Sequence, residues 1–267
     1  MCDRFGVSRS GFYNWEKRPK SKKPDRDKDL LRAIRRIHKG KRKSYGSPRV
    51  YKELRKQGVE CSRKRVARIM RENGIKASVV GLYSIRPKKH DIYQQADNIL
   101  GVVDKPKRPN QQWVADFTYL KTNQGWYYFS MILDRYSRKL VGWSFSKDRN
   151  TKFTKASLQM AIENEKPEKG LIFHTDQGSE YVAHKFQNTL KAASLVSSMS
   201  RKGKCLDNAM AESFFHTMKT EVIHHKKYKT MKSVKRDILS FIDFYNNDRL
   251  HSSLGYVSPR EFLKQAA

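Results

Sequence analysis

The 267-residue chain is long enough for two domains, and its 57 lysines and arginines against 26 acidic residues give a net charge of +31. Such an excess indicates a polyanionic partner, and nucleic acid fits better than a membrane because the sequence has no apolar run of membrane-spanning length and no secretory signal. The 37% of apolar residues allow packed domains, and the three cysteines have neither disulfide-framework nor zinc-finger spacing. We therefore expect a folded, intracellular protein with no membrane partner.

The first part of the chain is predicted to be helical and carries most of the positive charge. Before Trp113 there are 32 basic and 11 acidic residues, and after it there are 25 and 15. Apolar residues recur at helical spacing over residues 30–37, which predicts an amphipathic helix. Ser47 and Pro48 are expected to open a second helix, with the serine hydroxyl as its cap, and Ser62 to cap a third that stops at Gly74.

The second and third of these helices have the layout of a helix-turn-helix. Four basic residues lie near the start of the third helix, which would enter a major groove: Arg63, Lys64, Arg65 and Arg68. The alternative is a basic helix pair that simply faces solvent. We interpret residues 1–80 as a DNA-binding region, because the overall charge favours a nucleic-acid partner.

The pattern changes in the second part of the chain. Residues 81–104 are predicted to be a basic linker, because proline and lysine cluster around them without periodicity. Three runs rich in aromatic and β-branched residues, at 113–120, 125–134 and 139–145, predict antiparallel strands, and helix then alternates with strand. This order predicts an α/β fold class, with a mixed-sheet core over residues 105–225 and a helical extension over residues 226–267.

Three carboxylates occupy positions that ordinary surface charge does not explain. Asp116 lies inside the first strand, where aspartate is rare, and Asp176 directly follows a short apolar strand, where α/β sheets place their ligands. Glu212 lies on a helix, about 200° around the axis from Phe214, which belongs to the apolar stripe. Each carboxylate alone could be an ordinary turn or surface acid.

Brought together, three carboxylates would repel one another unless cations compensated them. All-oxygen ligands suit Mg²⁺ or Mn²⁺, whereas zinc would need nitrogen or sulfur ligands beyond His216, and the sequence places none convincingly. Two divalent ions would activate a water or a 3′-hydroxyl on one side of a phosphodiester and stabilise the departing oxygen on the other. The predicted chemistry is phosphoryl transfer on a nucleic acid.

The strings around these residues carry a family resemblance. Asp116 in WVADFTYL, Asp176 in HTDQGSEY and Glu212 in DNAMAESFF are similar to the DDE triad of retroviral-type integrases. The strings YGSPRVYKEL, KRVARIMRENGI and FYNNDRLHSSLGYVSPREF extend the resemblance over nearly the whole chain. The chain thus resembles the downstream reading-frame product of the insertion-sequence-three family of bacterial transposases.

The resemblance implies a ribonuclease-H-like catalytic core in which Asp116, Asp176 and Glu212 hold two Mg²⁺ or Mn²⁺ ions. Such a polynucleotidyl transferase would bind the ends of an insertion sequence, cleave there and join the liberated 3′-hydroxyl to target DNA. It would work as a homo-oligomer in the bacterial cytoplasm, associated with the nucleoid. Fusion to an upstream-frame product is also implied, because the motif at residues 7–15 looks like the last helix of a truncated helix-turn-helix.

Further residues are expected to contact DNA. Lys219 follows Glu212 by two helical turns on the same face, where members of this family carry a lysine or arginine near the scissile phosphate; as a surface lysine it would need no explanation. Arg249 and His251 are further candidates. Asn208 is expected to line the DNA path together with three cations of the preceding loop: Arg201, Lys202 and Lys204.

Two other functions stay open. A non-catalytic DNA-binding regulator derived from a transposase would need the basic helices but not the three carboxylates. A ribonuclease H would act on RNA–DNA hybrids and would not need a helix-turn-helix. An Asp116→Asn substitution separates the regulator from the enzyme, because the regulator would keep its activity.

Overall fold

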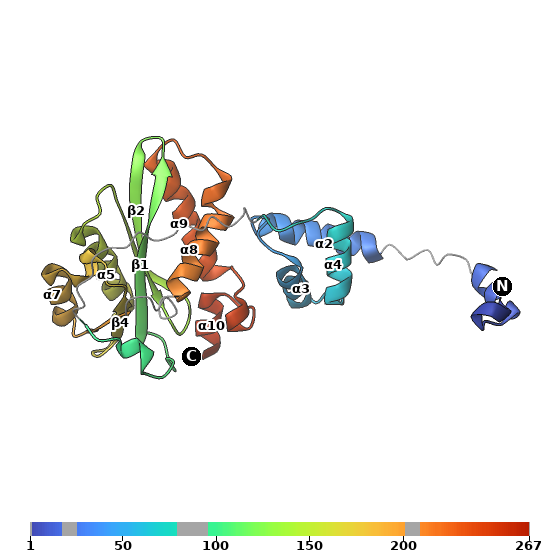
Figure 1. Ribbon diagram of the computed structural model, residues 1–267, viewed down its shortest axis with the longest axis horizontal. Helices are drawn as coiled ribbons and strands as arrows, with labels where there is room; N and C mark the ends of the chain where they lie inside the picture. Colours follow the sequence, from blue (N-terminus) through green and yellow to red (C-terminus); the bar gives the residue numbers. More distant parts are fainter. Residues whose placement is uncertain (1, 18–25, 79–95, 201–208, 267) are drawn as a thin grey trace. The chain divides into compact units, whose positions relative to one another are not determined.

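The computed structural model describes residues 2–17, 26–78, 96–200 and 209–266, and the chain divides into two compact units (Figure 1). The first unit spans residues 1–77 and the second residues 78–267. Within the described residues no helix is long and apolar enough to span a bilayer. The loop cations Arg201, Lys202 and Lys204 and the neighbouring Asn208 lie outside the described residues.

The first unit is helical, as predicted. After η1 (Asp3–Phe5) it consists of α1 (Arg9–Lys17), α2 (Arg26–Gly40), α3 (Ser47–Lys56) and α4 (Arg63–Glu72). The last three helices contact one another and share a small apolar core, in which Ile34, Val50 and Val66 are fully buried. The periodic apolar residues of the sequence therefore mark the inner faces of α2, α3 and α4.

The helix caps agree with the sequence at one position and differ at another. The Ser62 hydroxyl caps α4 by accepting a hydrogen bond from the backbone N–H of Arg65, at 3.2 Å, as predicted. The predicted cap of α3 is wrong. Gly46 is its N-cap and, as a glycine, has no side chain that could cap the helix. The Val50 N–H donates to the Gly46 carbonyl at 3.1 Å, so the helix starts one residue earlier than predicted.

The second unit is built on a five-stranded mixed sheet in the order β3-β2-β1-β4-β5. Its pairs β1–β2 and β2–β3 are antiparallel, whereas β1–β4 and β4–β5 are parallel. The strands are β1 (Gln112–Thr122), β2 (Gly125–Asp134), β3 (Leu140–Ser146), β4 (Ile172–Thr175) and β5 (Val196–Met199). The remaining elements are η2 (Ile99–Gly101), α5 (Thr151–Glu165), α6 (Ser179–Val182), α7 (His184–Ala192), α8 (Ala209–Glu221), η4 (Ile223–His225), α9 (Met231–Asn247), η5 (Ser252–Leu254) and α10 (Pro259–Ala266).

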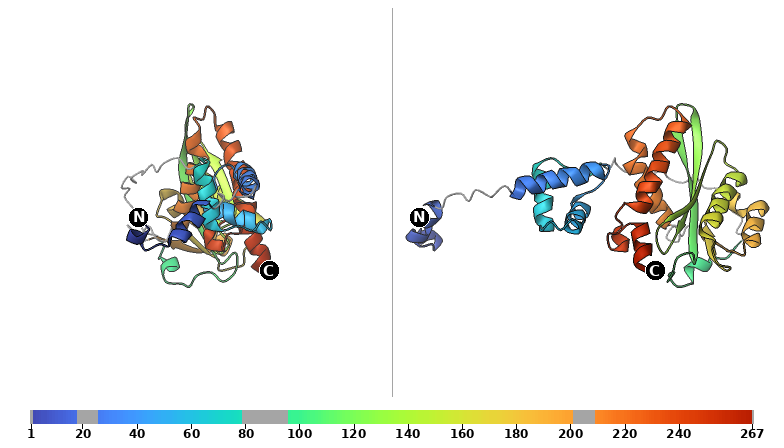
Figure 2. Two further views of the ribbon diagram at one scale, coloured as in Figure 1. Left: turned by 90° about the vertical axis from the view of Figure 1, so that its right-hand side faces the viewer. Right: turned by 180° about the vertical axis from the view of Figure 1, so that it is seen from behind.

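Helices cover both faces of this sheet, with α5 and α7 on one side and α8 and α9 on the other (Figures 1 and 2). Trp113 and Ala115 of β1 belong to the core beneath α5 and α7. Because neighbouring residues of a strand point to opposite faces, Val114 and Asp116 point towards the α8 side. Gly142 of β3 allows α5 to pack closely, since a Cβ atom at this position would overlap the Ser157 carbonyl oxygen.

The lengths of the parallel strands matter for the site. β1 pairs with β2 from Trp113 to Thr122, but it pairs with β4 only from Gln112 to Val114. Beyond Val114, the only sheet partner of β1 among the described residues is therefore β2. The next residue of β1 that points to the α8 side is Asp116, which lies just past the last parallel pair.

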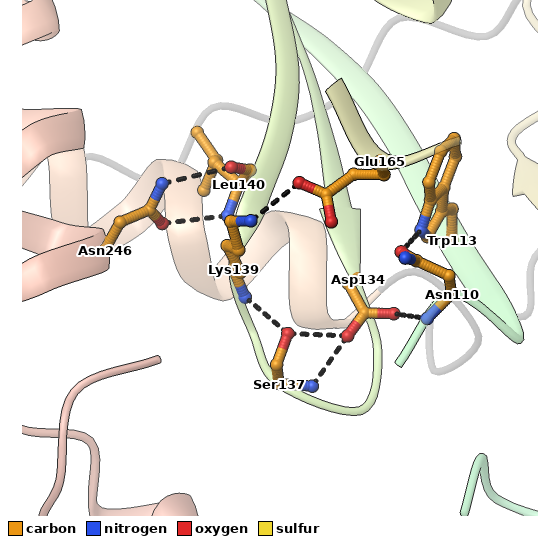
Figure 3. Close-up of polar contacts among 8 residues, drawn as sticks. All are labelled: Asn110, Trp113, Asp134, Ser137, Lys139, Leu140, Glu165 and Asn246. Carbon is orange, nitrogen blue, oxygen red and sulfur yellow. Dashed lines mark hydrogen bonds and ion pairs between the residues drawn. The ribbon is translucent and has the colours of Figure 1, made fainter. Parts of the chain in front are cut away.

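Buried polar contacts hold the open end of the β1–β2 hairpin, away from its turn (Figure 3). The buried Asp134 carboxylate accepts hydrogen bonds from the Asn110 N–H at 3.0 Å and from the Ser137 N–H and hydroxyl at 2.8 and 2.6 Å. The Asn246 amide bonds both backbone groups of Leu140, at 2.9 and 3.0 Å, and thus ties α9 to β3. Burial raises the pKa of Asp134, and the hydrogen bonds from Ser137 and Asn110 oppose the shift.

Candidate active site

Asp116 and Asp176 come from neighbouring parallel strands. Val114 of β1 is paired with His174 of β4, so the same register carried two residues further brings Asp116 and Asp176 side by side. A carboxylate oxygen of Asp116 accepts from the Phe117 N–H at 2.7 Å, and one of Asp176 accepts from the Gly178 N–H at 3.0 Å. Backbone donors therefore fix both side chains.

His174 is a hydrogen-bonding residue beneath this pair. Its side chain is fully buried. Nδ1 lies 2.9 Å from the Ser198 hydroxyl and Nε2 lies 2.9 Å from the Ser200 hydroxyl. Because both ring nitrogens already have partners, the imidazole connects β4 to β5 and its neighbour rather than binding a metal.

Glu212 enters from the helix on the same side of the sheet. It lies exposed in the first turn of α8, which contacts β1, whereas Phe214 and Met218 of the same helix are buried. The predicted helical phase is thus observed, with Glu212 away from the apolar stripe. Lys219 lies two turns further along, and its ammonium group is 5.5 Å from the centre of the Tyr119 ring.

The pKa shifts show that these groups lie close enough to interact. The pKa of Asp116 is raised well above its usual range, first by burial, then by the charge of Asp176 and to a lesser extent by that of Glu212. The Phe117 N–H and the Lys219 charge oppose this shift. The charges of Asp176, Glu212 and Lys219, which lie 60 or more residues from Asp116 in the sequence, therefore all act on Asp116.

A buried ion pair that the sequence did not reveal lies beside Asp176. Glu180 is only 4% exposed and binds the Arg149 guanidinium, whose Nη2 lies 3.1 Å from one carboxylate oxygen. The pKa of Asp176 is raised by burial and by the Glu180 charge, while the Gly178 N–H and the Arg149 charge lower it. The only sequence signal was a glutamate four residues after Asp176, beside an aromatic residue, which is too common a pattern to single out.

The carboxylates match the donor chemistry of a hard divalent cation. Burial and mutual repulsion make the charged form of Asp116 costly, so a cation between Asp116 and Asp176 would relieve both effects. Among the described residues, however, no three His, Cys, Asp or Glu side chains are gathered into a ready metal-binding group. The exposed Glu212 side chain would have to close onto the other two to complete one.

The basic residues of α4 fall into two groups. Arg63 and Lys64 are exposed at the start of the helix. By contrast, Arg65 and Arg68 both bind Asp27 of α2: the Arg65 Nε lies 2.7 Å from one carboxylate oxygen and the Arg68 Nη2 lies 2.9 Å from the other. These hydrogen bonds, that from Arg68 first, lower the pKa of Asp27. Arg65 and Arg68 therefore connect α4 to α2, a role that the sequence did not predict.

Arg249 is also engaged within the protein. Its guanidinium binds the Glu221 carboxylate of α8 at 2.7 and 3.2 Å, and both side chains are 5% exposed. The expectation that Arg249 approaches DNA is therefore wrong, because burial and pairing withdraw it from the surface.

Known families and proteins match both units. The chain matches an integrase core domain over residues 106–205 and again over residues 194–259, and an HTH-like domain over residues 24–89. It is 36% identical to the "insertion element IS600 uncharacterized 31 kDa protein" of Shigella sonnei, covering 99% of this chain and 98% of that protein. It is 35% identical to "transposase InsF for insertion sequence IS3A" of Escherichia coli strain K12, covering 98% and 92%.

The chain belongs to the IS3 family of transposases. The predicted resemblance is thereby confirmed. A chain in the cryo-EM structure of the simian T-cell lymphotropic virus intasome, bound to PP2A regulatory subunit B56 gamma, has the same fold. It is 12% identical with a TM-score of 0.51, covering 86% of this IS3-family chain and 74% of that chain. The predicted fold class, a ribonuclease-H-like mixed sheet preceded by a helical region, is confirmed.

Proposed function

We propose that this IS3-family protein binds the ends of an insertion sequence and catalyses divalent-metal-dependent DNA cleavage and strand transfer. The observation that supports the proposal is the pair of Asp116 and Asp176 at the ends of neighbouring parallel strands of an integrase-type sheet, with the charges of Glu212 and Lys219 near enough to act on Asp116. Repelling carboxylates at a partly buried position reduce stability, and a catalytic role accounts for their presence.

In this proposal Asp116, Asp176 and Glu212 hold Mg²⁺ or Mn²⁺, two ions per site. When bound, the ions lower the pKa of the attacking hydroxyl and stabilise the charge on the departing oxygen. The backbone N–H groups of Phe117 and Gly178 hold the two aspartates in place through the bonds described above. Glu212, on the exposed first turn of α8, is suited to close when DNA arrives.

Lys219 is proposed to contact the DNA phosphates next to the reacting bond. Burial lowers the pKa of Lys219, and the Asp116 charge opposes this shift, which indicates that the ammonium lies near the carboxylates. A cation at this position would offset the repulsion between the carboxylates and an incoming phosphate backbone. The loop residues Arg201, Lys202, Lys204 and Asn208 belong to the same proposal on sequence grounds alone.

The helical unit is proposed to supply a second DNA contact through the start of α4. Removing both exposed cations, Arg63→Ala with Lys64→Ala, is expected to weaken DNA binding at all sequences. It should also reduce the slope of log affinity against log salt by about two, because each phosphate contact contributes about 0.9. Fluorescence anisotropy with labelled duplex at several salt concentrations measures this slope.

The control for this experiment removes two exposed lysines elsewhere, Lys185→Ala with Lys191→Ala on α7, so that the net charge is the same. An equal change of slope in the control would contradict a specific role for α4. Arg65→Ala should instead lower the thermal stability of the helical unit, because Arg65 binds Asp27.

The proposed activity is tested by incubating the full chain, alone and fused to the upstream-frame product, with labelled element-end DNA, Mg²⁺ and a plasmid target. Metal-dependent joining of the labelled strand to the plasmid supports the proposal, and sedimentation of the DNA complex tests the proposed homo-oligomer. Specific DNA binding without any joining would favour the non-catalytic regulator. Cleavage restricted to the RNA strand of a hybrid would favour a ribonuclease H.

A further inference from the structure

A basic pocket lies at the turn of the β1–β2 hairpin. Figure 1 shows this turn beside the connection between α8 and α9. Its volume is about 680 Å³. The Asn123 N–H donates to the Tyr228 carbonyl at 2.9 Å and holds the two segments together. The side chains used below are Tyr119, Lys121, Trp126, Lys219 and Lys227, all of which line the pocket.

Two large aromatic side chains are exposed at this pocket. Tyr119 is 41% exposed and Trp126 is 51% exposed, and their ring centres lie 5.5 Å apart with an angle of 81° between the planes. The register pairs Tyr119 with Tyr128 and Lys121 with Trp126, so these residues lie on one face of the hairpin. Lower on that face, Phe153 of α5 packs against Tyr128, but Tyr119 and Trp126 remain exposed.

Positive charge surrounds the two rings. The Lys121 ammonium lies 5.7 Å from the centre of the Trp126 ring, and Lys219 lies over Tyr119 as described. Lys227 adds an exposed cation, whereas Lys226 is paired with Asp237 at 2.5 Å. No acidic residue is among the described residues that line the pocket. Exposed aromatic rings among lysines are the combination that binds single-stranded nucleic acid.

The pocket is linked to the carboxylate site through Lys219. Lys219 lines the pocket and interacts electrostatically with Asp116. Tyr119 lies three residues after Asp116 on β1, about 10 Å along the strand at its usual rise, and its side chain leaves the strand on the other face. A DNA strand advances about 3.4 Å per nucleotide in a duplex, so a strand that runs from the carboxylates past Lys219 to the other face needs more than about three nucleotides to meet Tyr119.

We propose that this pocket binds an unpaired nucleotide of the DNA strand that lies at the carboxylates. The base stacks on the face of one ring and meets the edge of the other, because Tyr119 and Trp126 are nearly perpendicular, and Lys121 and Lys227 contact the flanking phosphates. An unpaired base is required because the faces of paired bases are covered by their neighbours in a duplex, whereas a frayed or single-stranded base offers its face to an aromatic ring. This inference rests on the proposed function, since it assumes that DNA occupies the carboxylate site.

The test compares two DNA ligands with the full chain by fluorescence anisotropy, without divalent metal. One ligand is a blunt duplex, and the other is the same duplex with a single-stranded tail of about ten nucleotides. Tyr119→Ala and Trp126→Ala are each expected to weaken binding of the tailed DNA by about 10-fold, while binding of the blunt duplex changes little. Trp126→Phe, which keeps an aromatic ring, should retain most of the affinity.

Lys227→Ala is compared with Lys191→Ala, which removes the same charge from α7. Only the first should weaken the tailed complex selectively. The proposal would be overturned if Tyr119→Ala and Trp126→Ala weakened binding of both DNA ligands equally, or of neither. It would also be overturned if Trp126→Ala changed the oligomeric state but kept its affinity for tailed DNA. Because binding is measured without metal, the result does not depend on catalysis. A chain that stacks the tail but never joins strands would contradict only the proposed function.

Discussion

Asp116→Asn is expected to abolish divalent-metal-dependent strand joining, with a loss of roughly a thousand-fold or more, while binding to element-end DNA remains. The amide is nearly the same size and its oxygen can still accept from the Phe117 N–H, so the local structure should persist. It cannot, however, supply the negative charge that a divalent cation requires. Joining is followed with labelled end DNA and a plasmid target, and binding by anisotropy with the same DNA.

The same substitution should stabilise the metal-free protein, because it removes a buried charge that Asp176 and Glu212 repel. The folded-state pKa of Asp116 is raised, so the carboxylate reduces stability only at pH values above the ordinary aspartate pKa, and the loss grows until the pH passes the folded-state pKa. The gain in melting temperature of Asp116→Asn over the wild type should therefore be largest near neutral pH and shrink on acidification.

Asp104→Asn is the matched control, because Asp104 is exposed and lies outside the carboxylate site. It should change neither joining nor the melting temperature. Retained joining in Asp116→Asn would disprove the assignment of the site. A lower melting temperature at neutral pH would instead show that the repulsion at Asp116 is compensated within the protein.

The largest effect on stability is expected at the buried pair of Arg249 and Glu221. Glu221→Gln leaves the guanidinium buried beside a neutral amide, and breaking such a pair costs about 3–5 kcal/mol. For a unit of this size, this corresponds to a fall in melting temperature of about 10 °C. Because Glu221 ends α8, whose first turn carries Glu212, joining should also become more sensitive to temperature.

Two further variants test whether burial makes the Arg249–Glu221 pair contribute more to stability than an exposed ion pair does. Arg108→Ala breaks an ion pair with Glu168 whose side chains are 59% and 71% exposed, and it should cost less than about 1 kcal/mol. Replacing both Glu221 and Arg249 with methionine removes the buried charges together and should recover much of the loss. Calorimetry of the variants provides the comparison. An unchanged melting temperature in Glu221→Gln would show that the pair contributes little.

The sequence predicted the elements of the sheet and the positions of the candidate carboxylates because these depend on local pattern. An aspartate inside a strand, one directly after a strand and a glutamate opposite an apolar stripe can each be located from periodicity. The partners of Arg65 and Arg249 could not be predicted, since Asp27 and Glu221 lie far away along the chain and meet them only through helix packing. Ser47 was misplaced because a single backbone bond decides where a helix starts.

The end of the β1–β4 ladder at Val114 and His174 has a mechanical consequence for the carboxylates. No shared ladder bond fixes the separation of Asp116 and Asp176, since each lies two residues beyond the last pair, where twisted strands can splay. The Asp134 contacts, by contrast, anchor the open end of the β1–β2 hairpin. The backbone N–H groups of Phe117 and Gly178, rather than a shared ladder, therefore orient the two carboxylates.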